Sequence, residues 1–303
     1  MTTGSDYHDP VLLQACLEGL NIRPDGVYVD VTFGGGGHSR AILERLGEFG
    51  RLVAFDRDSD AWRNAPDDPR FTLVRSDFRW IKNHLRYLEM LPIDGLLADL
   101  GVSSHQFDTG ARGFSFRFSG PLDMRMDRRA ERTAAGLLDE LDEQGLIDLL
   151  RKYGEVEGAP RVARTIIAAR SQQRITSTND LVAALAPVTP RQEANSFLAQ
   201  VFQALRIAVN DELGSLERLL TTSAEVIKPG GRLVVMSYHS LEDRLVKNWM
   251  RSGDLGGAEN KDVFGRSSRP FKPTSNKAIQ PTEEETRTNP RARSARLRIA
   301  ERL

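Results

Sequence analysis

The chain has 303 residues, of which 40% are hydrophobic and 28% charged, and equal numbers of basic and acidic residues leave no formal net charge. This composition is typical of a globular protein and excludes a disordered or membrane-spanning chain. The first twenty residues do not resemble a secretory signal, so we expect a cytoplasmic protein. The single Cys16 excludes an intrachain disulfide and a metal site built only from cysteine, and we assign no metal-binding residue.

The first hundred residues predict half of a doubly wound sheet. Residues 27–31 and 51–56 are rich in β-branched and apolar side chains, which favours buried parallel strands. Between them, residues 38–48 have the apolar spacing of a helix, and residues 71–74 and 93–99 supply two further strands. Strands that alternate with helices predict the α/β class.

The pattern changes after the fourth predicted strand. Residues 134–153 and 162–173 predict long helices with no strand between them, so we interpret residues 106–208 as a helical insertion. The interrupted domain would then consist of residues 1–105 and 209–303.

The sheet pattern resumes in the last third of the chain. Residues 213–227 form an apolar helix stripe that ends at a Pro-Gly-Gly turn, and residues 233–236 follow as a strand. Ser240 and Asp243 resemble a capping box that begins a helix over residues 241–251.

The C-terminal region is first polar and then basic. Residues 252–289 are broken by Gly and Pro, which predicts irregular structure, and residues 296–299 predict a closing edge strand. Residues 287–302 carry six arginines against one glutamate, which is a local basic cluster of the kind that binds a polyanion. The residues that we expect to contact nucleic acid here, with a solvated edge as the alternative, are Asn289, Arg291 and Arg293.

Four consecutive glycines follow the first predicted strand. Residues 30–38 read Asp-Val-Thr-Phe-Gly-Gly-Gly-Gly-His, the pattern of a strand end, a tight turn and a helix start. Glycines let the backbone approach a ligand closely. Asp56 ends the second strand, where a carboxylate can accept the hydroxyls of a ribose. Together these features predict a nucleoside cofactor site, and a merely tight turn beside a solvated Asp is the alternative.

The glycine spacing argues against a dinucleotide cofactor. The fingerprint G-x-G-x-x-G requires a third glycine where this chain has Ser39 or Arg40, depending on which glycine begins the count. S-adenosylmethionine has no pyrophosphate. Its site therefore needs only a loop whose backbone can come close to the cofactor, a carboxylate for the ribose hydroxyls and contacts to the adenine. Phe78, beyond the third strand, is a candidate for packing on the adenine ring, and core packing is the alternative.

Asp99 ends the fourth predicted strand, at the carboxyl edge where open α/β sheets bind ligands. Methyl transfer is a displacement at a sulfonium, in which the enzyme aligns and desolvates the nucleophile. Asp99 is therefore our candidate for orienting the methionine part of the cofactor or a substrate amine, with helix capping as the alternative. His239 lies at the same predicted edge and is a candidate for phosphate orientation or proton transfer, with a structural role equally open.

Residues 112–127 mix arginine with phenylalanine, a combination that suits phosphate contacts and base stacking. The alternative is an ordinary hinge loop docked on the sheet. The residues that we interpret as substrate-facing are Arg112, Phe114, Phe116 and Arg125.

Eight sequence blocks, in order from the N-terminus to the tail, resemble successive signatures of one family. They are residues 8–13, 32–39, 99–104, 112–116, 120–127, 202–210, 239–244 and 289–295. The family is that of the bacterial 16S ribosomal RNA cytosine-N(4) methyltransferases, called RsmH or MraW, and the resemblance covers essentially the whole chain.

The resemblance implies a class I (Rossmann-like) S-adenosylmethionine-dependent methyltransferase whose inserted helical domain recognises the substrate. It implies methylation of the exocyclic N(4) amine of a cytidine near the decoding centre, with 16S ribosomal RNA in the small ribosomal subunit as the partner and no membrane. A homodimer is compatible with the sequence. The target cytidine should be unpaired or flipped, because a base amine inside paired RNA cannot be reached. Carried over by motif, the cofactor-binding positions are Gly36, Gly37, His38, Asp56, Phe78, Asp99 and Gln106.

Three rival functions require different residues. A DNA amino-methyltransferase normally has an Asp/Asn/Ser-Pro-Pro-Tyr/Phe motif after the fourth strand, where this chain has Asp99 followed by Leu-Gly-Val. A non-catalytic RNA-binding assembly factor has no need of Asp56, Asp99 and the glycine loop. An NAD-dependent dehydrogenase is disfavoured by the glycine spacing.

Overall fold

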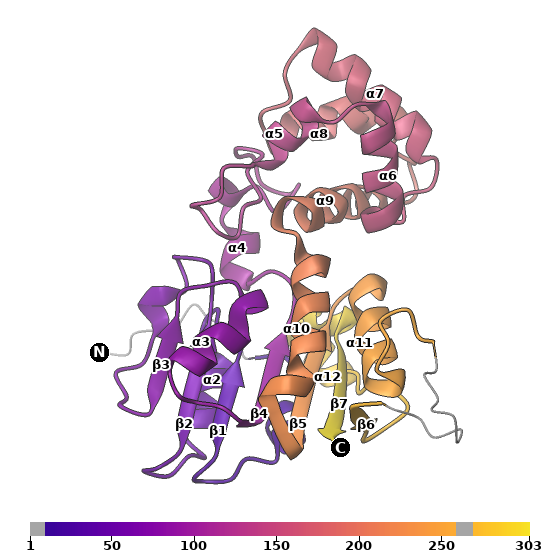
Figure 1. Ribbon diagram of the computed structural model, residues 1–303. Helices are drawn as coiled ribbons and strands as arrows, with labels where there is room; N and C mark the ends of the chain where they lie inside the picture. The colour runs from indigo at the N-terminus through magenta and orange to yellow at the C-terminus, as the bar shows by residue number, and fades with distance from the viewer. Residues whose placement is uncertain (1–9, 259–268) are drawn as a thin grey trace. The chain divides into compact units, whose positions relative to one another are not determined.

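The computed structural model of the protein describes residues 10–258 and 269–303 (Figure 1). The chain divides into two compact units. The sheet unit contains the described residues up to Gly101 and from Leu213 onward, and the helical unit is Val102–Glu212. The helical unit thus begins and ends a few residues outside the insertion that we placed at residues 106–208. None of the described helices combines the length and the apolar character needed to cross a bilayer.

The sheet unit confirms the predicted α/β class. Its described residues form a seven-stranded sheet in the order β3-β2-β1-β4-β5-β7-β6, in which the first five strands are parallel, β7 runs antiparallel to β5, and β6 runs antiparallel to β7. The strands are β1 (Val27–Asp30), β2 (Arg51–Phe55), β3 (Phe71–Val74), β4 (Ile93–Asp99), β5 (Ile227–Ser237), β6 (Phe271–Pro273) and β7 (Arg296–Arg302).

Helices cover both faces of this sheet, as a parallel sheet of apolar strands requires. One face packs against α3 (Ile81–Tyr87), α10 (Glu212–Val226) and α11 (Ser240–Ser252), which lie in front of the strands in Figure 1. The other face packs against α1 (Leu13–Leu20), α2 (Gly37–Leu43) and the short helix η5 (Pro290–Ser294). The remaining described helices of this unit are η1 (Trp62–Asn64), η2 (Phe78–Trp80) and α12 (Glu283–Thr288).

The C-terminal part of the sheet differs from the prediction in three ways. Strand β7 is not an edge strand, because β6 pairs with its outer side, and both β6 and α12 lie in a segment that we predicted to be irregular. Strand β5 begins at Ile227 and continues through the Pro-Gly-Gly turn, with a register shift against β4. Helix α11 is capped by His239, whose side chain accepts the amide of Glu242, so the expectation that Ser240 is the cap is wrong.

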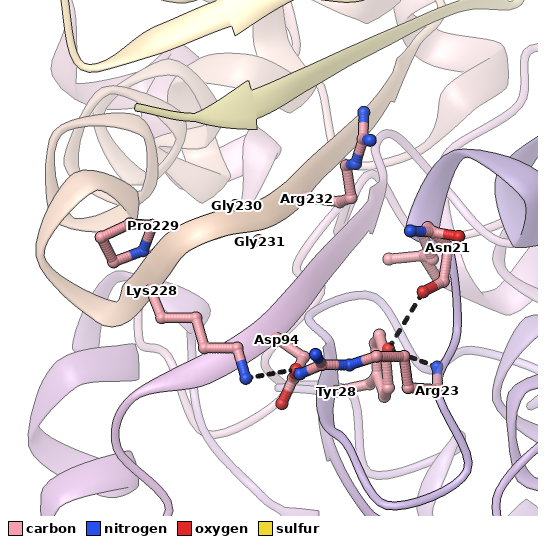
Figure 2. Close-up of a pocket in the computed structure, with 10 residues that line it drawn as sticks. Asn21, Arg23, Tyr28, Asp94, Lys228, Pro229, Gly230, Gly231 and Arg232 are labelled. Atoms are coloured by element: carbon pink, nitrogen blue, oxygen red, sulfur yellow. Dashed lines mark hydrogen bonds and ion pairs between the residues drawn. The ribbon is translucent and has the colours of Figure 1, made fainter.

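Asp94 ties the strands together at the amino end of β4 (Figure 2). Its carboxylate forms ion pairs with Arg23 and with Lys228, whose Nζ lies 2.6 Å away, and it accepts the amide of Val27 at 3.0 Å. Burial opposes ionisation of this carboxyl, but the hydrogen bonds from Lys228, Val27 and Arg23 lower its pKa below the usual value. The polar groups around Asp94 therefore form a structural cluster that fixes the starts of β1, β4 and β5.

The helical unit has its own apolar core. Its helices are α4 (Ser104–Asp108), η3 (Gly110–Arg112), α5 (Ala134–Glu140), α6 (Glu143–Gly154), α7 (Ala159–Gln172), α8 (Thr178–Leu185), η4 (Ala186–Val188) and α9 (Ala194–Asn210). The single helix predicted over residues 134–153 is two helices. The break occurs because Leu141 is extended and the Asp142 side chain accepts the amide of Gly145 at 2.8 Å, which caps a new helix.

Asn210 joins the last helix of this unit to the loop that follows η3. Its Oδ1 accepts the amide of Met126 at 2.7 Å, and its Nδ2 donates to the carbonyl of Met124 at 2.7 Å. The side chain is buried. Buried backbone groups that lose their partners are costly, so Asn210 fixes this loop against α9.

We expect Asn210→Ala to lower the free energy of unfolding by about 3 kcal/mol, because it removes the side-chain hydrogen bonds to the amide of Met126 and the carbonyl of Met124. Urea unfolding followed by circular dichroism measures this change. Asn195→Ala is the matched control, since Asn195 is exposed on the same helix. Equal stability of the two variants would show that Asn210 does not fix the loop.

Candidate active site

Three aspartates lie at the carboxyl edge of neighbouring parallel strands. Asp30 ends β1, Asp56 directly follows β2, and Asp99 ends β4. These strands are adjacent in the sheet, in the order β2-β1-β4. Open α/β sheets bind their ligands at this edge, so the fold gathers carboxylates from three separate parts of the sequence at one candidate site.

The glycine loop connects β1 to α2 and takes conformations that other residues rarely adopt. Gly34 has φ 51° and Gly36 has φ 77°. A Cβ on Gly36 would lie 2.9 Å from the ring of Phe33, so only glycine fits there. A Cβ on Gly37 would lie 2.3 Å from the Pro10 ring, which means that Gly37 allows the N-terminal segment to pack on the loop.

Asp30 fixes the two ends of the glycine loop by hydrogen bonds. It is buried, its Oδ1 accepts the amide of Thr32 at 3.1 Å, and its Oδ2 accepts the hydroxyl of Ser39 at 2.7 Å. Sequence reasoning did not assign a role to Asp30, although it is the last residue of the strand before the glycines. Its position at a strand end was the only signal that could have identified it.

Asp56 connects the glycine loop to the second strand. Its two oxygens accept the amides of Gly34 and Asp58, both at 2.8 Å. Burial raises the pKa of Asp56 to about 6, although the two amide hydrogen bonds oppose this shift. Each carboxylate oxygen can accept more than one hydrogen bond, so Asp56 can hold the loop and still accept hydroxyl groups of a ligand.

Asp99 is surrounded by groups from three other elements. The hydroxyl of Tyr238, just after β5, donates to Asp99 Oδ1 at 2.8 Å, and Nδ1 of His38 in α2 lies 3.7 Å from Asp99 Oδ2. Its amide donates to the hydroxyl oxygen of Thr32 at 2.7 Å. Burial raises the pKa of Asp99 to about 6, opposed by His38 and by the Tyr238 hydrogen bond. Asp99 does not cap a helix, because Ser103 caps α4.

His38 and His239 are both held inside the sheet unit. The Nε2 of His38 lies 3.2 Å from the carbonyl of Val11, in the segment that packs on the glycine loop. His239 caps α11 through Nδ1, and its Nε2 lies 3.2 Å from a carboxylate oxygen of the buried Glu242. Glu242 also accepts the amide of Tyr238 at 3.0 Å. His239 therefore has a structural role as a cap.

Phe78 and Gln106 have local structural partners. Phe78 is partly buried against the apolar core on the α3 side of the sheet, the packing named above as the alternative to an adenine contact. Gln106 belongs to the helical unit, where it forms a capping box: its Oε1 accepts the amide of Ser103 at 3.0 Å, and its own amide donates to the Ser103 hydroxyl at 3.2 Å.

Part of the predicted substrate-facing loop is interior, and this corrects the expectation for two residues. Arg112 is 3% exposed and donates to the carbonyl of Arg125 at 2.8 Å, and Phe114 is 4% exposed in the core of the helical unit. Phe116 packs edge-on against Phe202, with ring centroids 5.6 Å apart. Arg125 forms a two-pronged ion pair with Asp123, with both N···O distances 2.8 Å. The side chains of Arg112 and Arg125 thus bond protein groups of the same unit.

The basic tail enters the sheet at the candidate site. Asn289 caps η5 by accepting the amide of Arg291, and the side chains of Arg291 and Arg293 are exposed. Strand β7 begins at Arg296, which pairs with Ser237 at the carboxyl end of β5. The tail arginines therefore lie near the same sheet edge as Asp99.

The resemblance block at residues 8–13 also contains His8, which is outside the described residues.

The arrangement favours a ligand that brings positive charge and hydroxyl groups. The carboxylates of Asp56 and Asp99 have pKa values of about 6 because burial, and not a nearby guanidinium, dominates their surroundings. A cation that enters such an edge gains attraction in a medium of low dielectric constant. Hydroxyl groups can meanwhile use the acceptor positions that the backbone amides leave on Asp56.

The raised pKa of Asp99 predicts a pH dependence of stability in the ligand-free protein. The pKa is about 6 in the folded state against 3.8 for an unperturbed aspartate, so the folded state binds more protons between these values. Asp99 therefore favours folding near pH 4 and favours it less as the pH rises to 7. We expect the stability of the natural protein relative to Asp99→Asn to fall by up to about 3 kcal/mol over this interval. Urea unfolding at several pH values measures it, and a flat difference would contradict the assignment.

The sequence has relatives that match it over nearly its full length. It is 54% identical over 300 residues to "Ribosomal RNA small subunit methyltransferase H" of Parabacteroides distasonis, covering 99% of this chain and 98% of that protein. The protein of the same name from Flavobacterium johnsoniae is 51% identical over 303 residues, covering 100% of both chains.

An rRNA methylase from Streptococcus thermophilus aligns over 96% of this chain and 93% of its own, with 12% identity and a TM-score of 0.41. The MraW methylase family matches residues 5–303. The chain therefore belongs to the MraW methylase family.

Proposed function

We propose that this protein is an S-adenosylmethionine-dependent methyltransferase that methylates the exocyclic N(4) amine of a cytidine near the decoding centre of 16S ribosomal RNA. The observation that carries the proposal is the group of carboxylates beside a glycine loop at one sheet edge, in which Asp30 is buried and Asp56 and Asp99 are partly buried. Membership of a methylase family supports the reaction, and the names of relatives at 51–54% identity support ribosomal RNA of the small subunit as the substrate.

The residues at this edge fit S-adenosylmethionine better than a dinucleotide. Its ribose has hydroxyls whose hydrogen bonds Asp56 can accept, and its sulfonium and ammonium groups carry the positive charge that the partly buried carboxylates of Asp56 and Asp99 favour. A pyrophosphate would instead bring negative charge to the same edge. When bound, S-adenosylmethionine supplies an electrophilic methyl group. The residues that would hold it are Gly36, Gly37, His38, Asp56 and Asp99, with Phe78 and Gln106 as less direct candidates.

Asp99 has the chemistry needed to orient an amine. The lone pair of an exocyclic base amine is delocalised into the ring, and an acceptor on the amine protons helps to localise it. Asp99 Oδ1 already accepts the Tyr238 hydroxyl, which leaves further acceptor positions on the carboxylate for an amine or for the cofactor ammonium. His239 lies one residue beyond Tyr238, and we propose that it orients the substrate backbone, while its capping of α11 keeps the ring in place.

The RNA surface in this proposal consists of the tail residues Asn289, Arg291 and Arg293. Arginine binds phosphate by charge and by paired hydrogen bonds, and the tail arrives at the edge that holds Asp99. We propose that the helical unit also recognises the substrate, and that Phe116 and Arg125 shape its loop. The small subunit is assembled in the cytoplasm, so we propose that the protein acts there.

Methyl transfer to RNA tests the proposal as a whole. The purified protein, radiolabelled S-adenosylmethionine and small-subunit RNA, offered free and in particles, should give labelled RNA. Mass-spectrometric mapping should find N(4)-methylcytidine missing from ribosomal RNA of a strain that lacks the protein. A folded protein that labels none of these substrates, or a strain with unchanged nucleosides, would refute it.

The Asp56→Ala variant tests the cofactor assignment. We expect S-adenosylmethionine to bind about 5- to 150-fold more weakly, which corresponds to about 1–3 kcal/mol, because its ribose hydroxyls lose a charged acceptor. Calorimetry measures this affinity, and Asp67→Ala, at an exposed aspartate further along the same loop, is the control. Unchanged affinity in Asp56→Ala would remove Asp56 from the site, and binding of NAD in place of S-adenosylmethionine would favour a dehydrogenase.

The tail arginines predict a salt effect on RNA binding. Arg291→Ala and Arg293→Ala should each weaken RNA binding and reduce the slope of log K against log salt by about 1, while cofactor affinity stays the same. Fluorescence anisotropy at several salt concentrations measures the slope. Arg45→Ala is the control, because exposed Arg45 lies beyond the far end of α2. An unchanged slope would place the RNA surface elsewhere.

A further inference from the structure

Tyr238 is the first residue after β5, and sequence reasoning gave it no role. Its hydroxyl donates to Asp99 Oδ1 at 2.8 Å, although the two residues are 139 positions apart in the sequence. The contact exists because β4 and β5 are parallel neighbours in which Asp99 pairs with Met236. The ring of Tyr238 packs against the apolar core on the α1 and α2 side of the sheet.

The Asp99 carboxylate is held from two sides. Tyr238 fixes Oδ1, while the imidazole of His38 faces Oδ2 at 3.7 Å. His38 is itself fixed, because its Nε2 lies 3.2 Å from the carbonyl of Val11. A phenol that lies against a carboxylate can only donate its proton to it, so Tyr238 stabilises the ionised form of Asp99.

We propose that Tyr238 is a positioning residue for methyl transfer, and that its hydroxyl fixes the Asp99 carboxylate so that the remaining acceptor positions meet the substrate amine or the cofactor ammonium. This inference rests on the proposed function. Tyr238 does not need to touch the reacting atoms, because it acts through Asp99. A freely rotating carboxylate would lose part of the alignment that displacement at a methyl group requires.

The titratable groups around Asp99 come from several elements and set the direction of the expected pH effect. They are Asp30 at the end of β1, His38 in α2, Glu242 in α11, Cys16 in α1 and Tyr238 itself. Asp30 and Glu242 raise the pKa of Asp99, whereas His38 and Tyr238 lower it, and burial has the largest effect. Removal of the Tyr238 hydroxyl leaves a more basic Asp99, so the ionised form is reached only at higher pH.

The test is Tyr238→Phe, which keeps the ring and removes only the hydroxyl. We expect kcat for RNA methylation at neutral pH to fall by about tenfold, and the acid limb of the pH–rate profile to move up by about one pH unit. A structural role of the ring would leave the profile in place. The matched control is Tyr87→Phe, because Tyr87 is 86% exposed and should change neither quantity.

A double variant extends the test, and a direct titration makes it independent of activity. In Asp99→Asn, the further change Tyr238→Phe should have no effect on the pH profile, because no carboxylate remains to be held. The direct titration follows the NMR signal of the Asp99 carboxyl carbon in the ligand-free protein, which is identified by its loss in Asp99→Asn. This signal should titrate about one pH unit higher in Tyr238→Phe.

The two failures can be distinguished. An unchanged Asp99 titration with an unchanged pH–rate profile, in a natural protein that methylates RNA, would overturn the role of Tyr238 and leave the proposed function intact. A shifted titration in a natural protein that methylates no RNA would overturn the proposed function and, with it, the role of Tyr238 in methyl transfer.

Discussion

Hydrogen bonds from backbone amides to two aspartates determine the shape of the candidate site. Asp30 accepts the amide of Thr32, and Asp56 accepts the amides of Gly34 and Asp58. A buried carboxylate is costly unless its oxygens are satisfied, and a glycine loop is costly in conformational entropy unless something holds it. Here the amides of the loop satisfy the carboxylate oxygens, and the carboxylates hold the loop. The loop is therefore ordered before any ligand binds. Binding then incurs a smaller entropic cost.

The same sheet edge holds an ordered loop and two aspartates, Asp56 and Asp99, whose negative charge is disfavoured in the ligand-free protein. Asp56 and Asp99 have pKa values of about 6 because burial dominates, so the ligand-free protein is destabilised by their ionisation at neutral pH. A ligand that carries positive charge and hydroxyl groups relieves this cost, whereas an anionic dinucleotide increases it. The electrostatics of the edge and the missing third glycine of the dinucleotide fingerprint therefore favour the same class of cofactor by independent arguments.

The loop at residues 112–127 shows how composition can mislead. Arginine and phenylalanine together suggest an RNA surface, yet Phe114 is buried in the helical unit and Arg112 donates to a backbone carbonyl. Arginine carries five donors, which can bind carbonyl oxygens of an irregular loop as well as phosphates. The alternation of apolar residues through Leu122, Met124 and Met126 was the signal of a core segment. The exposed tail arginines, by contrast, have the accessibility that phosphate contacts need.

The sequence by itself determined the α/β class, the first four strands, the helical insertion, the glycine loop and the candidacy of Asp56 and Asp99, because periodicity and strand-end position are local properties. Only the tertiary structure decided that β7 is interior, that His239 caps α11, and that Tyr238 holds Asp99. The contact between Tyr238 and Asp99 depends on β4 and β5 becoming neighbours after a long insertion. No local pattern records that pairing, since it arises from the packing of segments more than a hundred residues apart.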